Sequence, residues 1–450
     1  MSKRIVRAFA IFLLAVSGGI GAAAQDGADT GYSPYSVYGV GDLYRQGTAY
    51  SRTMGGVGIA GRDRRYINLN NPAAITARDT LAFMADFGLS ENNYIFRQRD
   101  LKTGYNTFNI NDFAFSFPIW RSSAMVFGVT PYSSVGFDFS KRITDPTLIG
   151  NTGSIEYTSS GSGGVYQIFG GAAVTLWKRL SLGAQAIYYT GNIDKTTYMN
   201  FDNDSYRDLS SGYILNLNGF SGKFGLQYEQ PIKDLYLTVG ATYKLSNRLR
   251  GYVTGYKYGV SASKTDTLYH HVDTLMNSQK VRLADELGVG ISIRKPEKWT
   301  FEFNWIRSGW ASSGMDSYPG FGNIGVTSAG APLTFSATAS ESFRAGFEFV
   351  PNRNDVRYYL RRCAYRIGAY YDKSYYKLDG NNIFSYGVTF GVTLPVSKMS
   401  GGIPLYNGVT LGLDIGRKGS LTDNMVRETY AMIVIGFSIH DIWFVKQLYD

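Results

Sequence analysis

The sequence predicts an all-β fold, an antiparallel transmembrane β-barrel of about 14 strands with an N-terminal plug in its lumen. Three observations support this prediction. The chain starts with the pattern of a secretory signal. Most of the remaining chain alternates between apolar and polar residues. The connections between these segments are alternately short and long. The composition agrees, since 35 Tyr, 27 Phe and 53 Gly accompany only 12 Pro, and these residues suit twisted strands, aromatic girdles and tight turns.

The first 24 residues have the three parts of a secretory signal. Lys3, Arg4 and Arg7 form the charged start, residues 11–16 form a short apolar centre, and residues 22–24 form a small-residue cleavage site. The apolar centre is too short to cross a bilayer as a helix, although an uncleaved anchor helix is the alternative interpretation. A cleaved signal takes the chain out of the cytoplasm, and we expect it in the cell outer membrane.

The strongest signal is the alternation itself. Successive side chains of a strand face opposite sides, so alternation indicates two different environments. Phe301 and Phe303 fall on one face of such a segment, for example, with Glu302 between them on the other. Each segment has about ten residues, the length that a tilted strand needs to cross a bilayer. The 14 expected strands lie near residues 81–89, 109–119, 123–132, 163–176, 180–190, 213–229, 235–245, 283–294, 299–305, 339–349, 364–373, 384–394, 407–416 and 427–438.

A soluble β-sandwich also alternates and is the main alternative. Its core would use the apolar face, which leaves no place for so many aromatic residues on an exposed surface. The other face carries glycines and charges, among them Asp86, Asp112 and Asp414. A closed membrane barrel accommodates both faces, with an apolar exterior, a polar lumen and no unpaired strand edge in lipid.

The connections give an independent indication of orientation. Those after even-numbered segments are short, such as Lys178–Arg179, or bounded, as near 350–363 and 395–406. Outer-membrane barrels have short periplasmic turns and long outer loops, so an even strand number places both termini in the periplasm. The long connections expected outside the cell lie near residues 90–108, 133–162, 191–212, 246–282 and 309–338.

Residues 25–80 do not alternate and are rich in turn residues. They are too polar for lipid and they precede the first strand. Because a wide barrel lumen must be filled or it leaks, we expect this segment to enter the lumen from the periplasm. The chain therefore divides into a signal at 1–24, a plug at 25–80 and a transmembrane barrel at 81–450.

Two motifs within the expected plug resemble a known family. A run Arg-x-Met-Gly-Gly-x-Gly-x-Ala is followed by Asn-Pro-Ala just before the first strand. Both are similar to motifs of the FadL/TodX superfamily of 14-stranded outer-membrane barrels, and the Ser-Pro-Tyr-Ser start and His-Asp-Ile-Trp-Phe ending resemble its Bacteroidota branch, which includes the PorV barrel of the type IX secretion system. The plug motif comprises Arg52, Met54, Gly55, Gly56, Asn71, Pro72 and Ala73.

The resemblance implies a hatch in the lumen, with Asn71, Pro72 and Ala73 near a ligand route. It also implies a lateral exit through a disrupted third strand. Gly128 and Pro131 fall in the third expected strand, and a proline there cannot donate to the ladder. The position of Pro131 near the end of that segment favours the simpler alternative, in which it merely ends the strand at the membrane edge.

Several charged residues fall on the face that should line the lumen. Glu286, Glu302, Arg344 and Arg366 occupy inward positions of their segments. Inward carboxylates can do acid–base chemistry, but lumen-lining residues of barrels are normally polar. We expect these four, together with Lys244, to form charge networks that hold the plug.

Nothing in the sequence indicates an enzyme, a cofactor or a metal site. There is one cysteine, Cys363, and there are three histidines, without a Gly-x-Ser-x-Gly or His-Glu-x-x-His motif. Without the three basic residues of the signal, 45 − 3 = 42 basic residues face 35 acidic ones. This excess is scattered over turns and loops without a nucleic-acid-binding motif, so we expect no nucleic-acid partner.

Two functions from different classes fit these features. The first is passive uptake of hydrophobic or amphipathic small molecules, with a movable plug and outer-membrane lipid and a hydrophobic ligand as partners. The alternative is a non-transporting accessory barrel of a secretion or barrel-assembly complex, with a sealed plug and an envelope protein complex as partner. The family resemblance favours the first, and the polar run Arg62-Asp63-Arg64-Arg65 in the plug favours the second.

Overall fold

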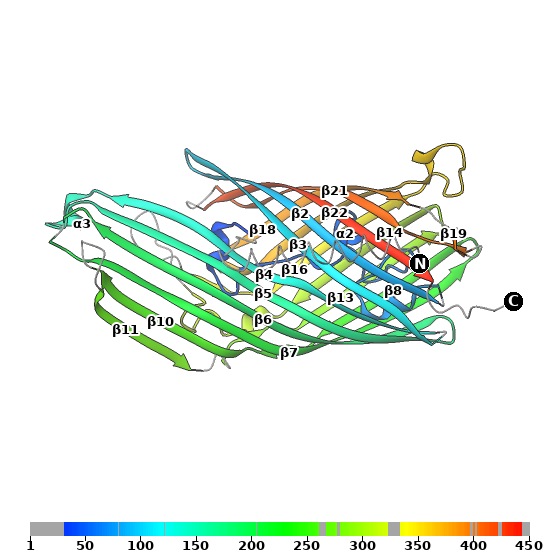
Figure 1. Ribbon diagram of the computed structural model, residues 1–450, viewed down its shortest axis with the longest axis horizontal. Coiled ribbons are helices and arrows are strands. Elements are labelled where there is room, and N and C mark those ends of the chain that lie inside the picture. The colour runs from blue at the N-terminus through cyan, green and yellow to red at the C-terminus, as the bar shows by residue number, and fades with distance from the viewer. Residues whose placement is uncertain are drawn as a thin grey trace.

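The computed structural model describes residues 31–442, apart from 80, 121, 204, 261–266, 277–279, 323–333, 397–398, 401–402 and 422–424. The expected signal at 1–24 and the start of the expected plug at 25–30 lie outside the described residues. Most of the described chain forms long, strongly tilted strands (Figure 1). No helix in the described part of the chain is long and apolar enough to span a bilayer.

Fourteen antiparallel strands form a closed barrel, as the alternation predicts. The main sheet has 18 strands, and 14 remain when four peripheral ones, β1, β10, β11 and β15, are set aside. The ring closes because β2 pairs with both β3 and β22. The barrel strands are β2 (Ala82–Gln98), β3 (Leu101–Trp120), β4 (Ser123–Ile143), β5 (Ile155–Leu176), β6 (Leu180–Phe201), β7 (Asp208–Ile232), β8 (Leu235–Lys244), β13 (Glu286–Lys295), β14 (Trp299–Ser308), β16 (Ser340–Phe349), β17 (Ala364–Leu378), β18 (Asn381–Pro395), β21 (Gly408–Gly419) and β22 (Arg427–Ile442).

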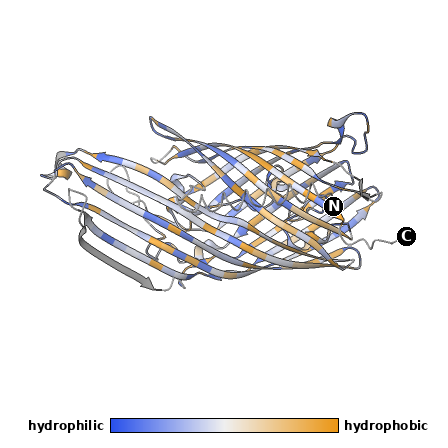
Figure 2. Ribbon diagram, viewed as in Figure 1, coloured by the Kyte–Doolittle hydropathy of each residue, from blue (hydrophilic) through white to orange (hydrophobic). Residues whose placement is uncertain are grey.

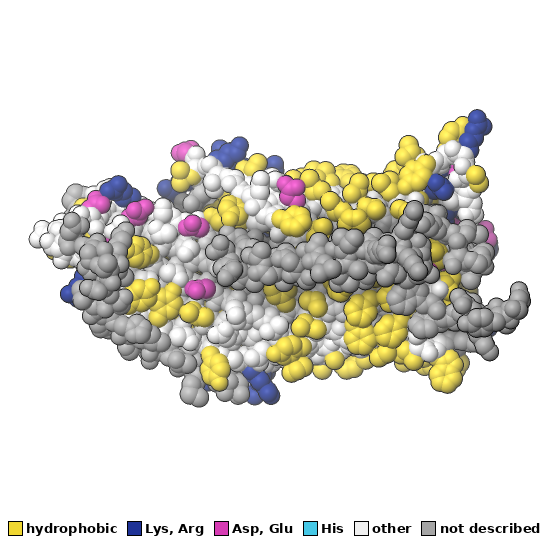
Figure 3. Space-filling model, in the orientation of Figure 1, with side chains coloured by type: hydrophobic (Ala, Val, Ile, Leu, Met, Phe, Trp, Pro, Cys, Tyr) yellow, Lys and Arg dark blue, Asp and Glu magenta, His cyan; other side chains and the backbone are white. Residues whose placement is uncertain are grey.

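The two faces of the strands are those that the alternation predicts. On β14, Phe301 and Phe303 point outward and are 41% and 40% exposed, whereas Glu302 between them is 1% exposed. The alternating hydropathy is visible along neighbouring strands in Figure 2. Figure 3 shows hydrophobic side chains gathered over the part of the barrel nearest the short turns, the end at which β19 (Met399–Ser400) is labelled in Figure 1. This arrangement suits an apolar belt facing lipid.

The opposite end differs from the expectation of long loops. Only Arg99 and Asp100 separate β2 from β3, so most of the expected loop at 90–108 is a continuous hairpin. Much of the expected loops at 133–162 and 191–212 is likewise strand, because β4 to β7 continue beyond the segments that alternate. Where both faces of a hairpin meet water, hydrophobic alternation stops although the backbone pairing continues. Alternation therefore detects only the lipid-facing part of each strand.

Further strands extend this end of the barrel. The expected loop at 246–282 contains β9 (Asn247–Arg248), β10 (Arg250–Val260), β11 (Thr267–Met276) and β12 (Arg282–Leu283). β10 pairs with β7 on one side and with β11 on the other, so these strands prolong the wall formed by β4 to β7 (Figure 1). The other connections contain α3 (Pro146–Ile149), η4 (Trp310–Ser312), β15 (Phe335–Ala337), η5 (Tyr359–Arg362), and β20 (Ile403–Pro404), which pairs with β19.

The N-terminal segment, which we define as the described residues 31–79, lies within the ring of strands (Figure 1). It contains η1 (Pro34–Val37), β1 (Asp42–Leu43), α2 (Ala49–Arg52) and η2 (Pro72–Thr76). Its hydrogen bonds reach walls on different sides of the barrel. Gly55 N donates to the hydroxyl of Thr389 on β18, and the Asn71 amide donates to Leu226 O on β7.

Candidate functional site

The N-terminal segment packs directly on inward-facing glycines of the barrel wall. A Cβ atom added to Gly368 would lie 2.2 Å from Gly55 N, and one added to Gly240 would lie 2.2 Å from Ile59 O. Real Cβ contacts are essentially never shorter than 3.0 Å, so the backbone of the segment occupies space that any other residue would fill. The wall glycines in such contact with the backbone of the segment are Gly136, Gly183, Gly240, Gly346 and Gly368, and those that would meet its side chains are Gly225, Gly391, Gly412 and Gly436.

The first half of the plug motif forms the tightest of these contacts. Met54 is fully buried. Gly55 and Gly56 adopt φ values of +74° and +81°, which only glycine adopts without strain. Gly55 N donates to Thr389 Oγ1 at 2.8 Å, so the turn is fastened to the wall as well as packed against it. Arg52 is the last residue of α2, and its Nε donates to the carbonyl of Gly47 within the same segment.

The second half of the motif is a buried structural connection. Asn71 caps η2, accepting a hydrogen bond from Ala73 N at 3.0 Å, and Pro72 starts that helix. The Asn71 amide also donates to Ile59 O at 2.7 Å and to Leu226 O at 3.2 Å. Asn71, Pro72 and Ala73 do not line the lumenal cavity described below, although the neighbouring Asn70 does. The structure therefore gives these three residues a packing role.

A buried charge network joins the segment to β16 and β17. Arg366 Nε donates to one oxygen of Glu348 at 2.8 Å, and Arg65 of the segment donates to the other. Arg366 also donates to Tyr66 Oη at 2.8 Å, and its guanidinium carbon lies 4.6 Å from the centroid of the Tyr50 ring. All five residues are at most 7% exposed. The sequence picks out Arg366, but it does not show that Glu348 is the carboxylate between two guanidinium groups.

Arg65 has a second carboxylate partner in the segment itself. Its Nε and backbone N both donate to Asp63 Oδ1, at 2.8 and 2.9 Å. Burial alone would raise the pKa of Asp63, but the charge of Arg65 and its hydrogen bonds hold that pKa well below its usual value. Asp63 therefore stays ionised, and Arg65 lies between two carboxylates.

The other expected lumen charges divide into two groups. Glu302 accepts a hydrogen bond from Ala60 N at 2.9 Å, and Arg344 donates to Gly56 O at 3.3 Å, so both contact the segment. Glu286 instead pairs with Lys244 of the neighbouring strand at 3.3 Å. The structure thus brings Glu302, Arg344 and Arg366 to the segment and leaves Glu286 in a pair within the wall.

Two further charged contacts were not expected from the sequence. Arg45 of the segment pairs with Asp414 of β21 at 2.7 Å. The ammonium group of Lys195 on β6 is fully buried and donates to Val37 O at 2.6 Å and to Gly320 O at 3.0 Å. Lys195 therefore ties the segment to the connection that follows η4. Lys195 falls in the loop expected at 191–212, so the sequence predicts neither its inward position nor its backbone partners.

The third barrel strand separates from its neighbour in mid-course. The pairing of β3 with β4 stops at Phe113 and Val129, although both strands continue. Gly128 and Pro131 lie at this separation, and the register of β4 with β5 shifts immediately after Pro131. The expectation that Pro131 ends the strand is wrong, because β4 runs on to Ile143. Pro131 cannot donate to a ladder, but β4 keeps its pairing with β5 on its other edge.

The N-terminal segment takes the place of β3 along the exposed edge of β4. β1 pairs with Ser133 and Ser134, and Ser33 N donates to Gly136 O at 2.8 Å. Tyr32 spans the separation, because its hydroxyl donates to Asp138 O of β4 while its ring stacks on Tyr105 of β3 at 4.1 Å. The lateral separation is thus bridged by the segment.

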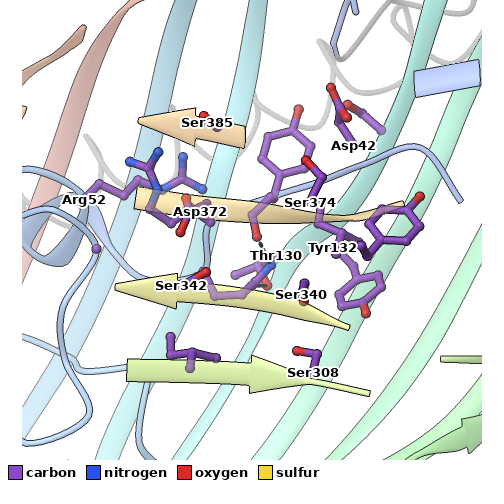
Figure 4. Close-up of a pocket in the computed structure, with 18 of the residues that line it drawn as sticks. Asp42, Arg52, Thr130, Tyr132, Ser308, Ser340, Ser342, Asp372, Ser374 and Ser385 are labelled. Carbon is purple, nitrogen blue, oxygen red and sulfur yellow. Dashed lines mark hydrogen bonds between the residues drawn. The ribbon is translucent and has the colours of Figure 1, made fainter. Parts of the chain in front are cut away.

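A cavity of about 310 Å³ remains between the segment and the wall. Its lining mixes many hydroxyl and charged groups with aromatic and aliphatic side chains, and somewhat more of its surface is apolar than polar. The described residues contain no group of three or more His, Cys, Asp or Glu side chains that could hold a metal ion. Figure 4 shows this lining, and the residues labelled there are Asp42, Arg52, Thr130, Tyr132, Ser308, Ser340, Ser342, Asp372, Ser374 and Ser385.

Comparisons with known proteins identify a family and several solved structures that this chain resembles. A family model described as BamG matches residues 1–450. Among curated proteins none matches the chain. The solved structures similar to it include the Ralstonia pickettii toluene transporter TbuX, at 16% identity and a TM-score of 0.55 over 87% of this chain and 97% of that one.

Two more solved structures agree with the first. The monoaromatic hydrocarbon channel CymD is 16% identical, with a TM-score of 0.53 over 91% of this chain and all of that one. The Pseudomonas putida toluene transporter TodX is 14% identical, with a TM-score of 0.53 over 90% of this chain and 100% of that one. At these identities the likeness shows the fold, and it confirms the predicted resemblance to the FadL/TodX barrels.

Proposed function

We propose, from the premise that this chain belongs to the BamG family, that it is a sealed, non-conducting barrel serving as an accessory subunit of an outer-membrane protein assembly. The observation that carries the proposal is the contact between the N-terminal segment and the wall glycines. A movable plug needs a solvated or deformable boundary, whereas here the backbone of the segment lies directly on the backbone of the wall at Gly240, Gly346 and Gly368. Close-packed interfaces have no room for sliding without loss of contacts. The N-terminal segment and the barrel strands then act as one rigid body.

The lining of the lumenal cavity supports a sealed barrel. A site for a hydrophobic small molecule is mostly apolar, with a few polar groups that orient the ligand. The cavity here contains many more polar groups than such a site needs, among them serine hydroxyls and the charges of Arg52 and Asp372, although apolar atoms still supply somewhat more of its surface. An apolar molecule would strip water from these groups without replacing their hydrogen bonds.

The orientation follows from the connections. We infer a location in the outer membrane, since the sequence predicts a secretory signal before the barrel and the apolar belt of the barrel needs lipid. The short turns then face the periplasm, with both termini, and the extended hairpins face outward. We infer no enzymatic role, because the similar structures are described as transporters and channels.

A projecting connection at the short-turn end offers a surface for a partner. The connection between β16 and β17 stands out from the barrel in Figure 1. It exposes Val356 and Leu360, at 99% and 66%, and two arginines whose guanidinium carbons lie over the ring of Tyr358, Arg357 at 5.3 Å and Arg361 at 4.8 Å. Tyrosine and arginine are the residues most enriched in interaction hot spots. We propose that a protein partner binds here.

Charge reversal tests this surface. Replacing Arg357 and Arg361 by glutamate should remove most of any protein that co-purifies in mild detergent, because hot-spot arginines contribute about 2 kcal/mol or more each. The matched control is R97E/K102E at the opposite end of the barrel, which should leave the partner bound. Quantitative mass spectrometry of the purified complexes provides the measurement. Equal retention of the partner by both double variants would contradict the assignment.

Passive uptake of hydrophobic molecules is the second candidate, because the similar structures are described as toluene transporters and a hydrocarbon channel and because β3 separates from β4.

The substitution Tyr32→Ala distinguishes a sealed barrel from an uptake channel. In a sealed barrel, proteoliposomes with the unaltered protein should admit toluene no faster than empty liposomes, and Y32A should raise the rate by weakening the bridge. The control is Tyr252→Ala, a 60% exposed tyrosine on β10. Rapid toluene entry through the unaltered protein would favour uptake.

A further inference from the structure

The outer surface of the barrel carries an open groove, separate from the lumenal cavity. It has a volume of about 730 Å³ and extends from the edges of β3 and β4 across β5, β6, β7 and β8 to β13. Its outward-facing lining is almost wholly apolar. The lining residues that shape it include Ala172, Val174, Leu182, Ala184, Phe224 and Leu287.

Small outward side chains create the groove. Ala172 of β5 pairs with Ala184 of β6, which pairs with Phe224 of β7. At comparable outward positions on β14 and β16, the wall carries large side chains such as Phe303 and Phe347. Two alanines beside a half-exposed phenylalanine therefore leave a hollow in an otherwise filled apolar belt.

The groove runs from the short-turn end into the belt. At one end Val174 and Leu182 lie just beside the turn between β5 and β6. At the other end Leu287 is the second residue of β13 and lies far along that strand from its short turn after Lys295. An elongated apolar group could therefore enter at the turn and extend toward the middle of the bilayer.

Basic and aromatic residues surround the entrance. Trp177 is 82% exposed in the turn between β5 and β6, beside Lys178, and Lys233 is exposed in the turn between β7 and β8. The turn between β5 and β6 contacts β7 four residues before Lys233, since Glu229 N donates to Arg179 O at 2.9 Å. Tryptophan prefers the headgroup level of a bilayer, and clustered lysines and arginines favour anionic headgroups. Asp234 is the acidic neighbour in these turns, so the cluster stays net basic.

We propose that the groove and its two basic turns form a binding site for a glycerophospholipid of the leaflet at the short-turn end. One acyl chain lies along the alanine-floored groove, and the phosphate accepts charge-assisted hydrogen bonds from Lys178 and Lys233. Two features distinguish this site from the rest of the lipid-facing surface. They are the hollow left by the two alanines and the two lysines at its entrance. This inference does not depend on whether the lumen is sealed.

The test counts bound lipid on the whole protein. Delipidated protein is titrated with dioleoylphosphatidylglycerol and analysed by native mass spectrometry. Filling the groove with A172F/A184F should weaken the first binding event about tenfold or more, which corresponds to about 1.4 kcal/mol. Reversing charge at the entrance with K178E/K233E should do the same, whereas inorganic phosphate should not compete in either protein.

Matched controls keep the result specific. Ala369→Phe adds an aromatic ring on the lipid face of β17, and R97E/K102E reverses charge at the far end; both should bind lipid like the unaltered protein. If the groove-filling variant binds lipid as well as the controls, the proposal is wrong. If it instead loses a co-purifying protein and keeps its lipid, the groove is a protein interface and the lipid site is overturned.

Discussion

Gly368→Val is expected to drive the N-terminal segment from its position and to open the barrel. The Cβ atom of a new side chain would lie 2.2 Å from Gly55 N and 2.4 Å from the carbonyl carbon of Met54. Both atoms are backbone, so no rotamer change relieves the clash. Overpacking of this kind costs about 1–3 kcal/mol when side chains can adjust, and a rigid backbone neighbour places this case at the upper end. The variant should gain ion conductance in planar bilayers and protease cleavage between residues 31 and 79.

Ala369→Val is the control for this experiment. It adds similar volume one position away, on the lipid-facing side of the same strand. It should remain non-conducting and protease-resistant, which would show that β17 tolerates valine when the segment is not touched. A Gly368→Val protein that is as closed and as protected as the control would argue against direct packing of the segment on the wall.

The barrel was largely predictable because lipid and lumen impose opposite demands on successive residues. The positions of Phe301 and Glu302 on opposite faces follow from that rule alone. Outside the bilayer the rule no longer applies, so the long hairpin of β2 and β3 was expected to be a loop. Pro131 illustrates the same limit, because its missing donor is visible in the sequence but its neighbour across the sheet is not.

The site was less predictable because its contacts join residues far apart in the chain. Inward glycines such as Gly240 and Gly368 are visible as part of the small face, but an isolated strand does not show what packs on them. The charges show a similar contrast. Glu302 and Arg366 were recognisable as inward-facing, whereas the partners Ala60 and Glu348 depend on the path of the segment through the lumen.

Glu348→Leu is expected to destabilise the folded protein more than any other single change in the lumen. It removes the carboxylate that lies between Arg366 and Arg65 and leaves both guanidinium groups facing an apolar side chain. Breaking a buried pair by removing one partner costs about 3–5 kcal/mol, since the remaining charge is desolvated without compensation. The expected result is a lower urea midpoint for unfolding in detergent and faster proteolysis of the N-terminal segment.

Glu348→Gln separates charge from shape. The amide keeps the volume and one oxygen acceptor, so Arg366 retains one hydrogen bond, although the attraction between charges is lost. The stability of this variant should fall between that of the unaltered protein and that of the leucine variant.

Arg65 keeps Asp63 as a second carboxylate partner, whereas Arg366 has only hydroxyl and ring neighbours beside Glu348. The double variant E348L/R366L should therefore recover part of the lost stability, because it removes the stranded charge together with its partner. A double variant no more stable than Glu348→Leu alone would show that the network acts through shape and not through charge pairing.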